Sequence, residues 1–237
     1  MPAPDRRVSL PPEFILGGDV LSRQRCLSYR VTARQDPRWN HNVHYQQLLI
    51  DAIPASASSA LDIGCGDGFL VRRLADHLPH VVGIDLDEPS LARAHTEVAD
   101  LPAGRVELVH GDVLRHPFEP GSFDVVVAVA TLHHLDARTG LLRMRELVAP
   151  GGMLGLVGLA AASTPSDALL SLAGTVANRP YQAITRRRYW EQTSPTVWPP
   201  PESYSSMRKL VAELLPGARF RRHVFWRYSV LWSRPQN

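Results

Sequence analysis

The most informative segment of the chain is Leu61-Asp62-Ile63-Gly64-Cys65-Gly66-Asp67-Gly68. A short apolar run enters three glycines at alternate positions, and a helix is predicted to follow them. Glycine adopts positive φ angles and lets the backbone approach a ligand closely. The first turn of a helix offers unpaired N–H groups to the same ligand. The segment therefore predicts a ligand-binding turn between a strand and a helix.

The spacing of these glycines excludes two common nucleotide motifs. A dinucleotide-binding turn needs glycine at its first, third and sixth positions, and the sixth position here is Phe69. A phosphate-binding P-loop needs Lys followed by Ser or Thr, and no such pair follows Gly68. The pattern that remains is Asp-x-Gly-x-Gly-x-Gly, starting at Asp62.

Apolar runs and helical patterns alternate on both sides of this turn. Strands are predicted over Ala60–Ile63, His80–Ile84, Val106–Val109, Phe123–Val129 and Met153–Leu159, and helices over Tyr45–Ile53, Phe69–Leu78, Pro89–Ala99, Arg138–Val148 and Tyr204–Leu215. The strand segments are almost continuously apolar, which is typical of a parallel sheet covered on both faces. The alternation predicts a doubly wound α/β fold. The aromatic tail Ala218–Ser233 is predicted to add two closing strands.

The length of 237 residues fits one domain with additions. We predict an N-terminal lid segment over residues 1–44 and the α/β domain over residues 45–237. Residues 163–202 differ in composition, with prolines at 199–201 and a basic run at 186–188. This stretch is predicted to be a lid or cap insertion outside the sheet.

Two further acids are predicted to lie at the edge of the sheet that carries the glycine turn. Asp85 closes the next strand, where a carboxylate can accept hydrogen bonds from both hydroxyls of a ribose. Asp112 follows Gly111 at the end of the third strand, where its side chain and the Val113 N–H could bind the edge of an adenine. Open α/β sheets bind their ligands outside the carboxyl ends of the strands.

These motifs together resemble those of the class I S-adenosylmethionine-dependent methyltransferases, and in particular the small-molecule branch that includes ubiquinone- and menaquinone-biosynthesis-like enzymes. The resemblance covers residues 45–160 and rests on Asp62–Gly68, Asp85, Gly111-Asp112, Phe123-Asp124-Val125 and Leu132-His133-His134-Leu135. It implies a Rossmann-like, seven-stranded, mostly parallel sheet with an antiparallel last strand and helices on both faces. It also implies S-adenosylmethionine as cofactor and S-adenosylhomocysteine as product.

The resemblance assigns roles to individual residues around the cofactor. The methionine part would lie against Asp62, Gly64, Cys65, Gly66 and the backbone of Ala128. The ribose would bind Asp85, while Leu86 would pack on the adenine. Asp112 and Val113 would bind the adenine edge.

Transfer of a methyl group from a sulfonium is an in-line displacement, so the protein mainly aligns the nucleophile and excludes water. A hydroxyl acceptor also needs a base. His134 and His133 follow the fourth strand, and histidine has a suitable pKa; the resemblance favours His134 as the base over His133. In the alternative interpretation, one histidine caps the loop and the other packs on the cofactor.

The acceptor site is less well defined by the sequence. Candidate substrate contacts are Trp39, His41, Tyr45 and Tyr189. In the alternative interpretation, the first three belong to a solvated loop in which Trp39 and Tyr45 anchor the chain by packing. No set of ligands has metal-binding spacing, so we predict no metal.

The chain has an acidic middle and a basic tail, and this uneven charge raises alternatives to a small-molecule methyltransferase. Residues 51–178 carry 8 basic and 16 acidic residues, whereas residues 179–237 carry 11 basic and 3 acidic residues. A basic tail is compatible with a nucleic-acid methyltransferase. However, the fourth strand ends in Val127-Ala128-Val129-Ala130 rather than in the Asn/Asp-Pro-Pro-aromatic loop of base-amino methylating enzymes. A third hypothesis is a protein that binds S-adenosylmethionine without transferring methyl, as a scaffold or a cyclase.

We therefore predict an enzyme with a small-molecule acceptor, possessing an oxygen or nitrogen nucleophile, and no nucleic-acid or membrane partner. A role in secondary metabolism and a monomeric or homodimeric state are further predictions. Only two cysteines, Cys26 and Cys65, are present, which is typical of a reducing compartment. Because residues 1–9 show no apolar signal-peptide region and no 18-residue apolar run occurs, we predict a cytoplasmic location.

Overall fold

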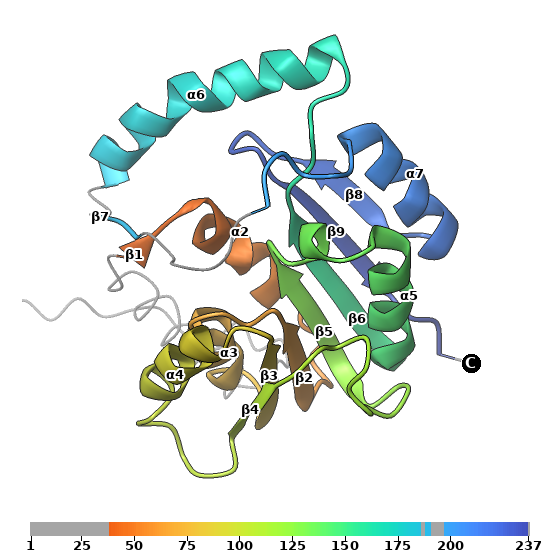
Figure 1. The fold of residues 1–237 in the computed structure, drawn as a ribbon. Coiled ribbons are helices and arrows are strands. Elements are labelled where there is room, and N and C mark those ends of the chain that lie inside the picture. Colours follow the sequence, from red (N-terminus) through yellow and green to blue (C-terminus); the bar gives the residue numbers. More distant parts are fainter. Residues whose placement is uncertain (1–37, 186–187, 191–196, 237) are drawn as a thin grey trace, which may run out of the picture. The chain divides into compact units, whose positions relative to one another are not determined.

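The structure is a computed structural model that describes residues 38–185, 188–190 and 197–236 (Figure 1). These residues belong to one compact unit, Pro37–Asn237. Most of the predicted N-terminal lid segment, and the basic residues Arg186 and Arg187, lie outside the described residues.

A seven-stranded sheet forms the centre of this unit, as predicted. Its strands, in spatial order, are β4 (Val106–His110), β3 (His80–Asp85), β2 (Ser59–Ile63), β5 (Phe123–Val129), β6 (Val148–Gly158), β9 (Tyr228–Ser233) and β8 (Arg219–Arg222). The first five strands are mutually parallel, and β9 runs antiparallel to both of its neighbours. The prediction of a mostly parallel sheet with an antiparallel last strand is confirmed.

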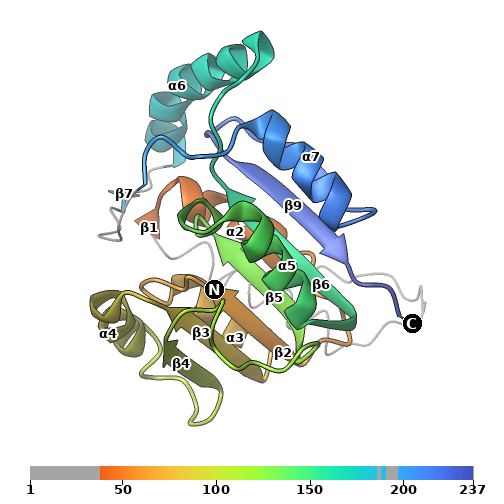
Figure 2. The same cartoon turned by 45° about the vertical axis from the view of Figure 1, so that its right-hand side comes forward.

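Helices cover both faces of the sheet (Figures 1 and 2). One face carries α5 (Ala137–Leu147) and α7 (Tyr204–Leu214), which pack against each other. The other face carries α2 (His41–Ile50), α3 (Phe69–Ala75) and α4 (Glu88–Glu97). The buried strand residues between them, such as Leu61, Val126 and Leu154, have no exposed surface. This double covering explains why the strands are apolar on both sides.

The first described helix begins four residues before its predicted start at Tyr45. Asn40 caps it, because its side-chain oxygen accepts hydrogen bonds from the N–H groups of Asn42 and Val43 at 2.9 and 2.8 Å. The boundary predicted after residue 44 therefore falls inside α2. Asparagine is a favoured N-cap, so Asn40 is the local signal that the periodicity missed.

The stretch predicted as an insertion contains more regular structure than expected. It includes α6 (Pro165–Thr185) and the short strand β7 (Arg188–Tyr189). The latter pairs in parallel with β1 (Arg38–Trp39), in a small sheet separate from the central one. The helix start was visible as Thr164-Pro165-Ser166-Asp167, since the Asp167 carboxylate accepts a hydrogen bond from the Thr164 N–H at 3.0 Å and the Thr164 hydroxyl accepts one from the Asp167 N–H at 3.1 Å.

Helix α6 is tied to the last strands of the sheet. Asp167 forms a largely buried ion pair with Arg222 of β8. Gly174 lies against the loop between β8 and β9, where a Cβ atom would come within 2.2 Å of the Val224 carbonyl oxygen. Among the described residues, no helix is long and apolar enough to cross a membrane.

Candidate active site

The glycine turn joins β2 to α3 in the conformation that its sequence predicts. Gly64, Gly66 and Gly68 have φ angles of 69°, 52° and 78°, a region that favours glycine. At Gly64 a side chain is also excluded by space, because a Cβ atom would lie 2.3 Å from the Thr131 hydroxyl oxygen. The turn after β5 therefore closes directly over the turn after β2.

Asp85, at the end of β3, is oriented by the backbone of both neighbouring turns. One carboxylate oxygen accepts a hydrogen bond from the Gly66 N–H at 2.7 Å, and the other accepts one from the Asp87 N–H at 2.9 Å. A carboxylate offers about four lone-pair positions. Two therefore remain for the hydroxyls of a ribose, the ligand group that the sequence analysis assigned to Asp85.

Asp62 is the most unusual acid of the site. It is 2% exposed, and within the described residues its carboxyl group has no hydrogen-bond partner. Burial and the neighbouring Asp85 raise its pKa to about 8. An isolated buried carboxylate is costly, so the carboxyl group is protonated at neutral pH until a cation approaches.

The remaining predicted cofactor contacts lie on the same edge of the sheet. Leu86 is 63% exposed, and its carbonyl oxygen bonds the His110 ring at 3.1 Å. The Asp112 carboxylate accepts a hydrogen bond from the Leu114 N–H at 2.9 Å. Val113 is buried, and no acceptor for its N–H occurs among residues 38–185, 188–190 and 197–236. The adenine edge could therefore use this N–H.

Two of the predicted contacts, Ala128 and Cys65, would act through the backbone alone. Ala128 pairs with Ile63 in the sheet, which places it next to Gly64. The Cys65 thiol is buried in the turn, and burial raises its pKa. A thiol that stays protonated is a poor nucleophile, so the Cys65 side chain is unsuited to nucleophilic chemistry.

This arrangement fits S-adenosylmethionine, which carries an ammonium and a sulfonium group. Asp62 and Asp85 lie close enough to raise the pKa of Asp62, and no cationic side chain in the described part of the chain offsets this. A ligand with two positive charges would supply the missing compensation. The positive φ angles of the glycine turn leave its backbone uncovered for such a ligand.

The two histidines after β5 lie in different environments. They form the short helix η1 (Leu132–His134), with ring centroids 4.1 Å apart. His133 is half-buried, and its Nδ1 atom is buried without a hydrogen-bond partner in the structure. Burial, then His134 and Arg227, lower its pKa to about 4. His134 is exposed; burial lowers its pKa, and the nearby Asp85 partly offsets this.

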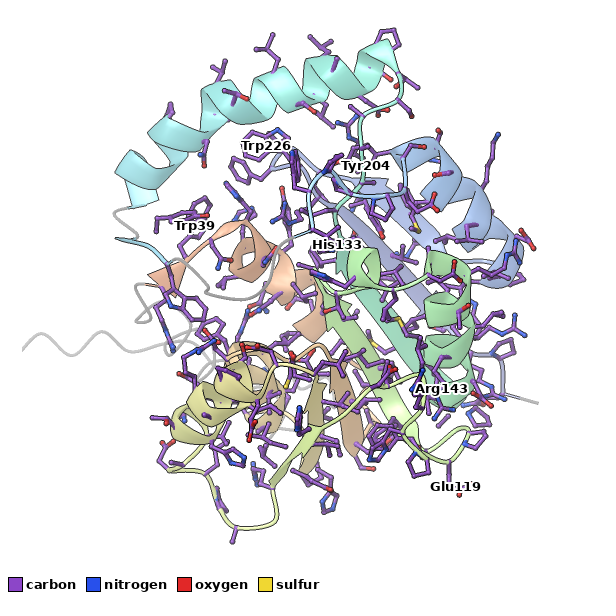
Figure 3. All side chains as sticks on the ribbon, in the orientation of Figure 1. Trp39, Glu119, His133, Arg143, Tyr204 and Trp226 are labelled. Atoms are coloured by element: carbon purple, nitrogen blue, oxygen red, sulfur yellow. The ribbon has the colours of Figure 1, made fainter. Side chains whose placement is uncertain are left out.

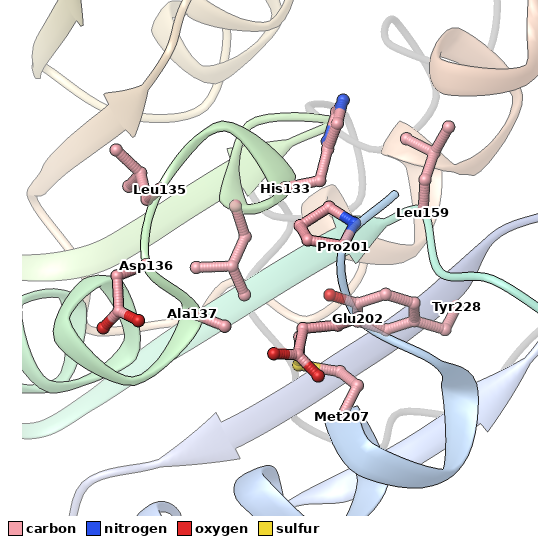
Figure 4. A pocket seen from close by; sticks show the side chains of 10 residues that line it. His133, Leu135, Asp136, Ala137, Leu159, Pro201, Glu202, Met207 and Tyr228 are labelled. Carbon is pink, nitrogen blue, oxygen red and sulfur yellow. The ribbon is translucent and has the colours of Figure 1, made fainter. Parts of the chain in front are cut away.

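A small cavity of about 100 Å³ lies behind His133, between η1, the start of α5 and the segment before α7. Figure 4 shows the His133 ring at its edge, pointing away from Glu202 and Met207. The imidazole is therefore directed away from the cavity, and Arg227 is one of the charged groups that interact with it. The cavity itself is too small for a substantial acceptor.

The predicted substrate contacts come together in one aromatic cluster. Trp39 is fully buried, and its ring packs edge-on against His41 at 5.2 Å and Phe225 at 6.0 Å between centroids. Tyr189 stands opposite Trp39 in the β1–β7 pair and is 56% exposed. Tyr45 is 7% exposed, and its hydroxyl accepts a hydrogen bond from the Phe225 N–H at 3.3 Å.

This cluster favours the interpretation of Trp39 and Tyr45 as packing anchors, although neither is in a solvated loop. His41 reaches α6, with its Nε2 atom 3.2 Å from the Asn178 side-chain oxygen. In Figure 3 the labelled side chains of Trp39, Trp226, Tyr204 and His133 lie along the same end of the sheet, below α6. The substrate roles of His41 and Tyr189 stay predictions.

Sequence reasoning missed Arg227, which immediately precedes β9. Its Nε atom donates a hydrogen bond to the Asn42 side chain at 2.8 Å. Burial lowers its pKa to about 10, and the groups that oppose this effect are Tyr204, Tyr189 and Tyr45. Apart from the basic composition of the tail, no signal in the sequence distinguishes it from the other arginines.

Among the described residues, no group of three or more His, Cys, Asp or Glu side chains could hold a metal ion. The polar groups singled out above are the acids around the glycine turn, the two histidines and Arg227.

Comparison with known proteins agrees with this geometry. Residues 60–152 match the model of a methyltransferase domain. An uncharacterized methyltransferase of Mycobacterium tuberculosis is 39% identical over 203 residues, which are 84% of this chain and 99% of that protein. The demethylmenaquinone methyltransferase of Staphylococcus aureus is 31% identical over 118 residues, 48% of each chain.

A solved structure shares the fold. Phosphoethanolamine N-methyltransferase 2 of Haemonchus contortus, in complex with S-adenosyl-L-methionine, superposes with a TM-score of 0.57 at 16% identity, covering 84% of this chain and 53% of that one. The sheet order, the glycine turn and the relative that matches most of the chain lead to one assignment. The protein is an enzyme that uses S-adenosylmethionine, and it belongs to the class I S-adenosylmethionine-dependent methyltransferases.

Proposed function

We propose that this enzyme transfers the methyl group to an oxygen or nitrogen atom of a small molecule, with His133 accepting the proton that the acceptor loses. The observation that carries this proposal is the position of His133. It follows β5 directly, beside the turn that closes over Gly64, and its imidazole is neutral at physiological pH. A neutral imidazole at this place can accept a proton from a nucleophile as it attacks.

The residues of the chain divide the work of such a reaction. When bound, the cofactor supplies a methyl group that its sulfonium already activates. Asp62 and the glycine turn would hold the methionine end of the cofactor, and Asp85 would hold its ribose. Asp112, Val113 and Leu86 would hold the adenine. The aromatic cluster of α2, β7 and the β8–β9 loop would exclude water and orient the acceptor, which is the main requirement for an in-line displacement.

His133 suits the role of base better than His134, which the sequence analysis preferred. The His134 ring is exposed and lies near Asp85, on the cofactor side. The His133 ring is half-buried and lies near Arg227, on the side of the aromatic cluster. A base must face the acceptor, and the acceptor approaches the cofactor from the second of these sides.

A small acceptor is supported by two observations. The demethylmenaquinone methyltransferase among the relatives, which matches this chain over 118 residues, is named for a small-molecule acceptor. The end of β5 lacks the Asn/Asp-Pro-Pro-aromatic sequence of base-amino methylating enzymes. A place in secondary metabolism and a cytoplasmic location, the latter based on cysteine usage, are parts of the same proposal.

The test is release of S-adenosylhomocysteine by the purified protein with a panel of phenols, hydroxy acids and amines. Acceptor-dependent release that is lost in Asp85→Ala and retained in Asp100→Ala, an exposed acid outside the site, would support the proposal. Methylation of RNA or DNA, with binding that falls steeply with salt, would replace it by the nucleic-acid alternative. Tight binding of S-adenosylmethionine with no release for any acceptor would favour a scaffold or a cyclase.

A further inference from the structure

Arg227 lies at the carboxyl edge of the sheet, where the active site is built. The residue after it, Tyr228, begins β9 opposite Gly158, the last residue of β6. Trp226 before it has a φ of 51°, so the chain turns sharply at this point. The Arg227 guanidinium is held by two hydrogen bonds, from Nε to the Asn42 side chain at 2.8 Å and from Nη1 to the Trp226 carbonyl at 3.3 Å.

The Arg227 guanidinium has no acidic partner among the described residues. Its five N–H groups make two hydrogen bonds, both to neutral oxygens, which leaves three on Nη1 and Nη2. Arg222 on the neighbouring strand, in contrast, pairs with Asp167. The Arg227 residue is half-buried, and burying a cation without an anion is costly. Burial accordingly lowers the pKa of Arg227.

The backbone of Arg227 lies three strands away from the glycine turn. In the sheet order, β5 and β6 lie between β2 and β9. Neighbouring strands are about 4.8 Å apart, so Arg227 starts about 14 Å from the strand that carries the glycine turn. His133, which follows β5, lies between them and interacts electrostatically with Arg227. The guanidinium is therefore on the acceptor's side of the base.

We propose that Arg227 binds an anionic group of the methyl acceptor, a carboxylate or a phosphate, through its free Nη1 and Nη2 donors. A guanidinium fork matches such groups with two parallel hydrogen bonds. Tyr45, Tyr189 and Tyr204 lie near enough to interact electrostatically with the guanidinium, and Trp226 precedes it in the chain. This inference rests on the proposed function and names its substrate class: a small molecule with one anionic end and one nucleophilic oxygen or nitrogen.

The same contact would adjust the base. The charged groups that interact with the His133 ring are His134 on its own turn and Arg227 before β9. Asp136 at the start of α5, Glu202 before α7 and Tyr228 of β9 lie around the cavity behind it. An anion on Arg227 offsets the positive charge that disfavours the imidazolium form of His133. Binding of the correct acceptor would therefore raise the pKa of His133 and make it a stronger base.

The experiment follows the His133 ring by NMR in the full chain saturated with S-adenosylhomocysteine. Benzoate and phenyl phosphate serve as probes of the two anionic groups, and benzyl alcohol as the neutral control. We expect saturable shifts of the His133 signal and a rise of its pKa with at least one anion and none with benzyl alcohol. Arg227→Gln should abolish the response, whereas Arg221→Gln, at an exposed position on β8, should retain it.

If the His133 signal of Arg227→Gln no longer responds to anions, the variant Arg227→Lys shows whether the loss reflects misfolding. It keeps the charge, so the low pKa of His133 should persist, but the paired donors are gone and the affinity for the anion should fall about tenfold. The probe that binds identifies the group as carboxylate or phosphate. Equal responses of wild type and Arg227→Gln, or no response to either anion, would overturn the proposal.

A cofactor titration separates this inference from the proposed function. If Arg227→Gln weakens S-adenosylhomocysteine binding more than about threefold, Arg227 serves the cofactor and the inference is wrong, while methyl transfer to a small molecule stands. If anions bind to Arg227 but no small molecule releases S-adenosylhomocysteine, the proposed function is wrong and the anion site stands.

Discussion

The cofactor side and the acceptor side of the active site are built in opposite ways. The cofactor side comes from one continuous stretch, residues 62–128, whose proposed cofactor contacts lie at the ends of successive parallel strands. The acceptor side joins residues from α2, β7, η1 and the β8–β9 loop, which are up to 185 positions apart in the chain. Motifs within one stretch can be recognised in a sequence, but an assembly of distant segments cannot.

The two sides also differ in charge. Asp62 and Asp85 lie together without a compensating cation, whereas Arg227 lies without an acid, in each case among the described residues. Each side thus lacks the charge that its expected ligand brings. The cofactor brings positive charge to the acids, and the acceptor we propose brings negative charge to Arg227. Holding these charged groups uncompensated before the ligands bind costs free energy, which the rest of the fold supplies, as is usual for binding sites.

The largest expected effect tests whether the acceptor side can be destabilised without a change in cofactor binding. Asp167→Asn leaves Arg222 without its partner at the anchor of α6, and breaking a buried pair costs about 3–5 kcal/mol. We expect a lower free energy of unfolding and faster hydrogen exchange in α6, with unchanged affinity for S-adenosylhomocysteine. Urea unfolding and calorimetry measure these quantities; a matching loss of cofactor affinity would show that the two sides are not independent.

The next effect concerns the base between the two sides. His133→Gln should lower kcat about 100-fold, equivalent to about 2.7 kcal/mol, with little change in cofactor affinity. His134→Gln should lower it less than tenfold. Steady-state kinetics with any acceptor found active decides between them. The opposite ranking would return the role to His134 and place the acceptor on the Asp85 side.

A smaller effect is expected at the ribose position. Asp85→Asn removes the negative charge while retaining one oxygen acceptor. We expect S-adenosylhomocysteine binding to weaken by about 1–3 kcal/mol, roughly 5- to 150-fold in Kd. Asp100→Asn, in an exposed ion pair with Arg72, is the control and should bind normally. Unchanged affinity of Asp85→Asn in calorimetry would contradict the assignment of the ribose.

The smallest effect is a pH dependence of stability caused by Asp62. Its pKa is about 8 in the folded protein and near the ordinary value of 3.8 when unfolded. Between these values the folded state holds a proton that the unfolded state has lost, so stability falls as the pH rises. Asp62→Asn lacks this titration. Relative to wild type, it should gain about 1 kcal/mol from pH 7 to pH 8, or about 2–4 °C in Tm.

The cofactor counteracts this effect, which gives a second measurement. Because a cationic ligand favours ionised Asp62, binding of S-adenosylmethionine near pH 7 should release a proton in wild type and none in Asp62→Asn. Calorimetry in buffers of different ionisation enthalpy measures the number of protons. Equal proton release by both proteins would show that Asp62 is already ionised before the cofactor binds.

The sequence predicted the central sheet well for a specific reason. Strands such as Phe123–Val129 are buried on both faces, so their apolar character is continuous and independent of distant residues. Their ends coincide with Gly64, Asp85 and Asp112, residues whose chemistry is evident from type and position. The errors concern caps and long-range pairs: Asn40 moved a helix start, and the β1–β7 pair joins segments 150 residues apart.

By itself the sequence determined the doubly wound sheet, the glycine turn and the cofactor acids, because each depends on contacts along one stretch of chain. Only the tertiary structure decided which histidine lies near Arg227, and that Arg227 has no acidic partner among the described residues. Both follow from β9 inserting between β6 and β8, which brings the end of the chain to the edge where η1 stands. Burial and the absence of a nearby opposite charge depend on how distant segments pack together, and no residue pattern along the chain predicts them.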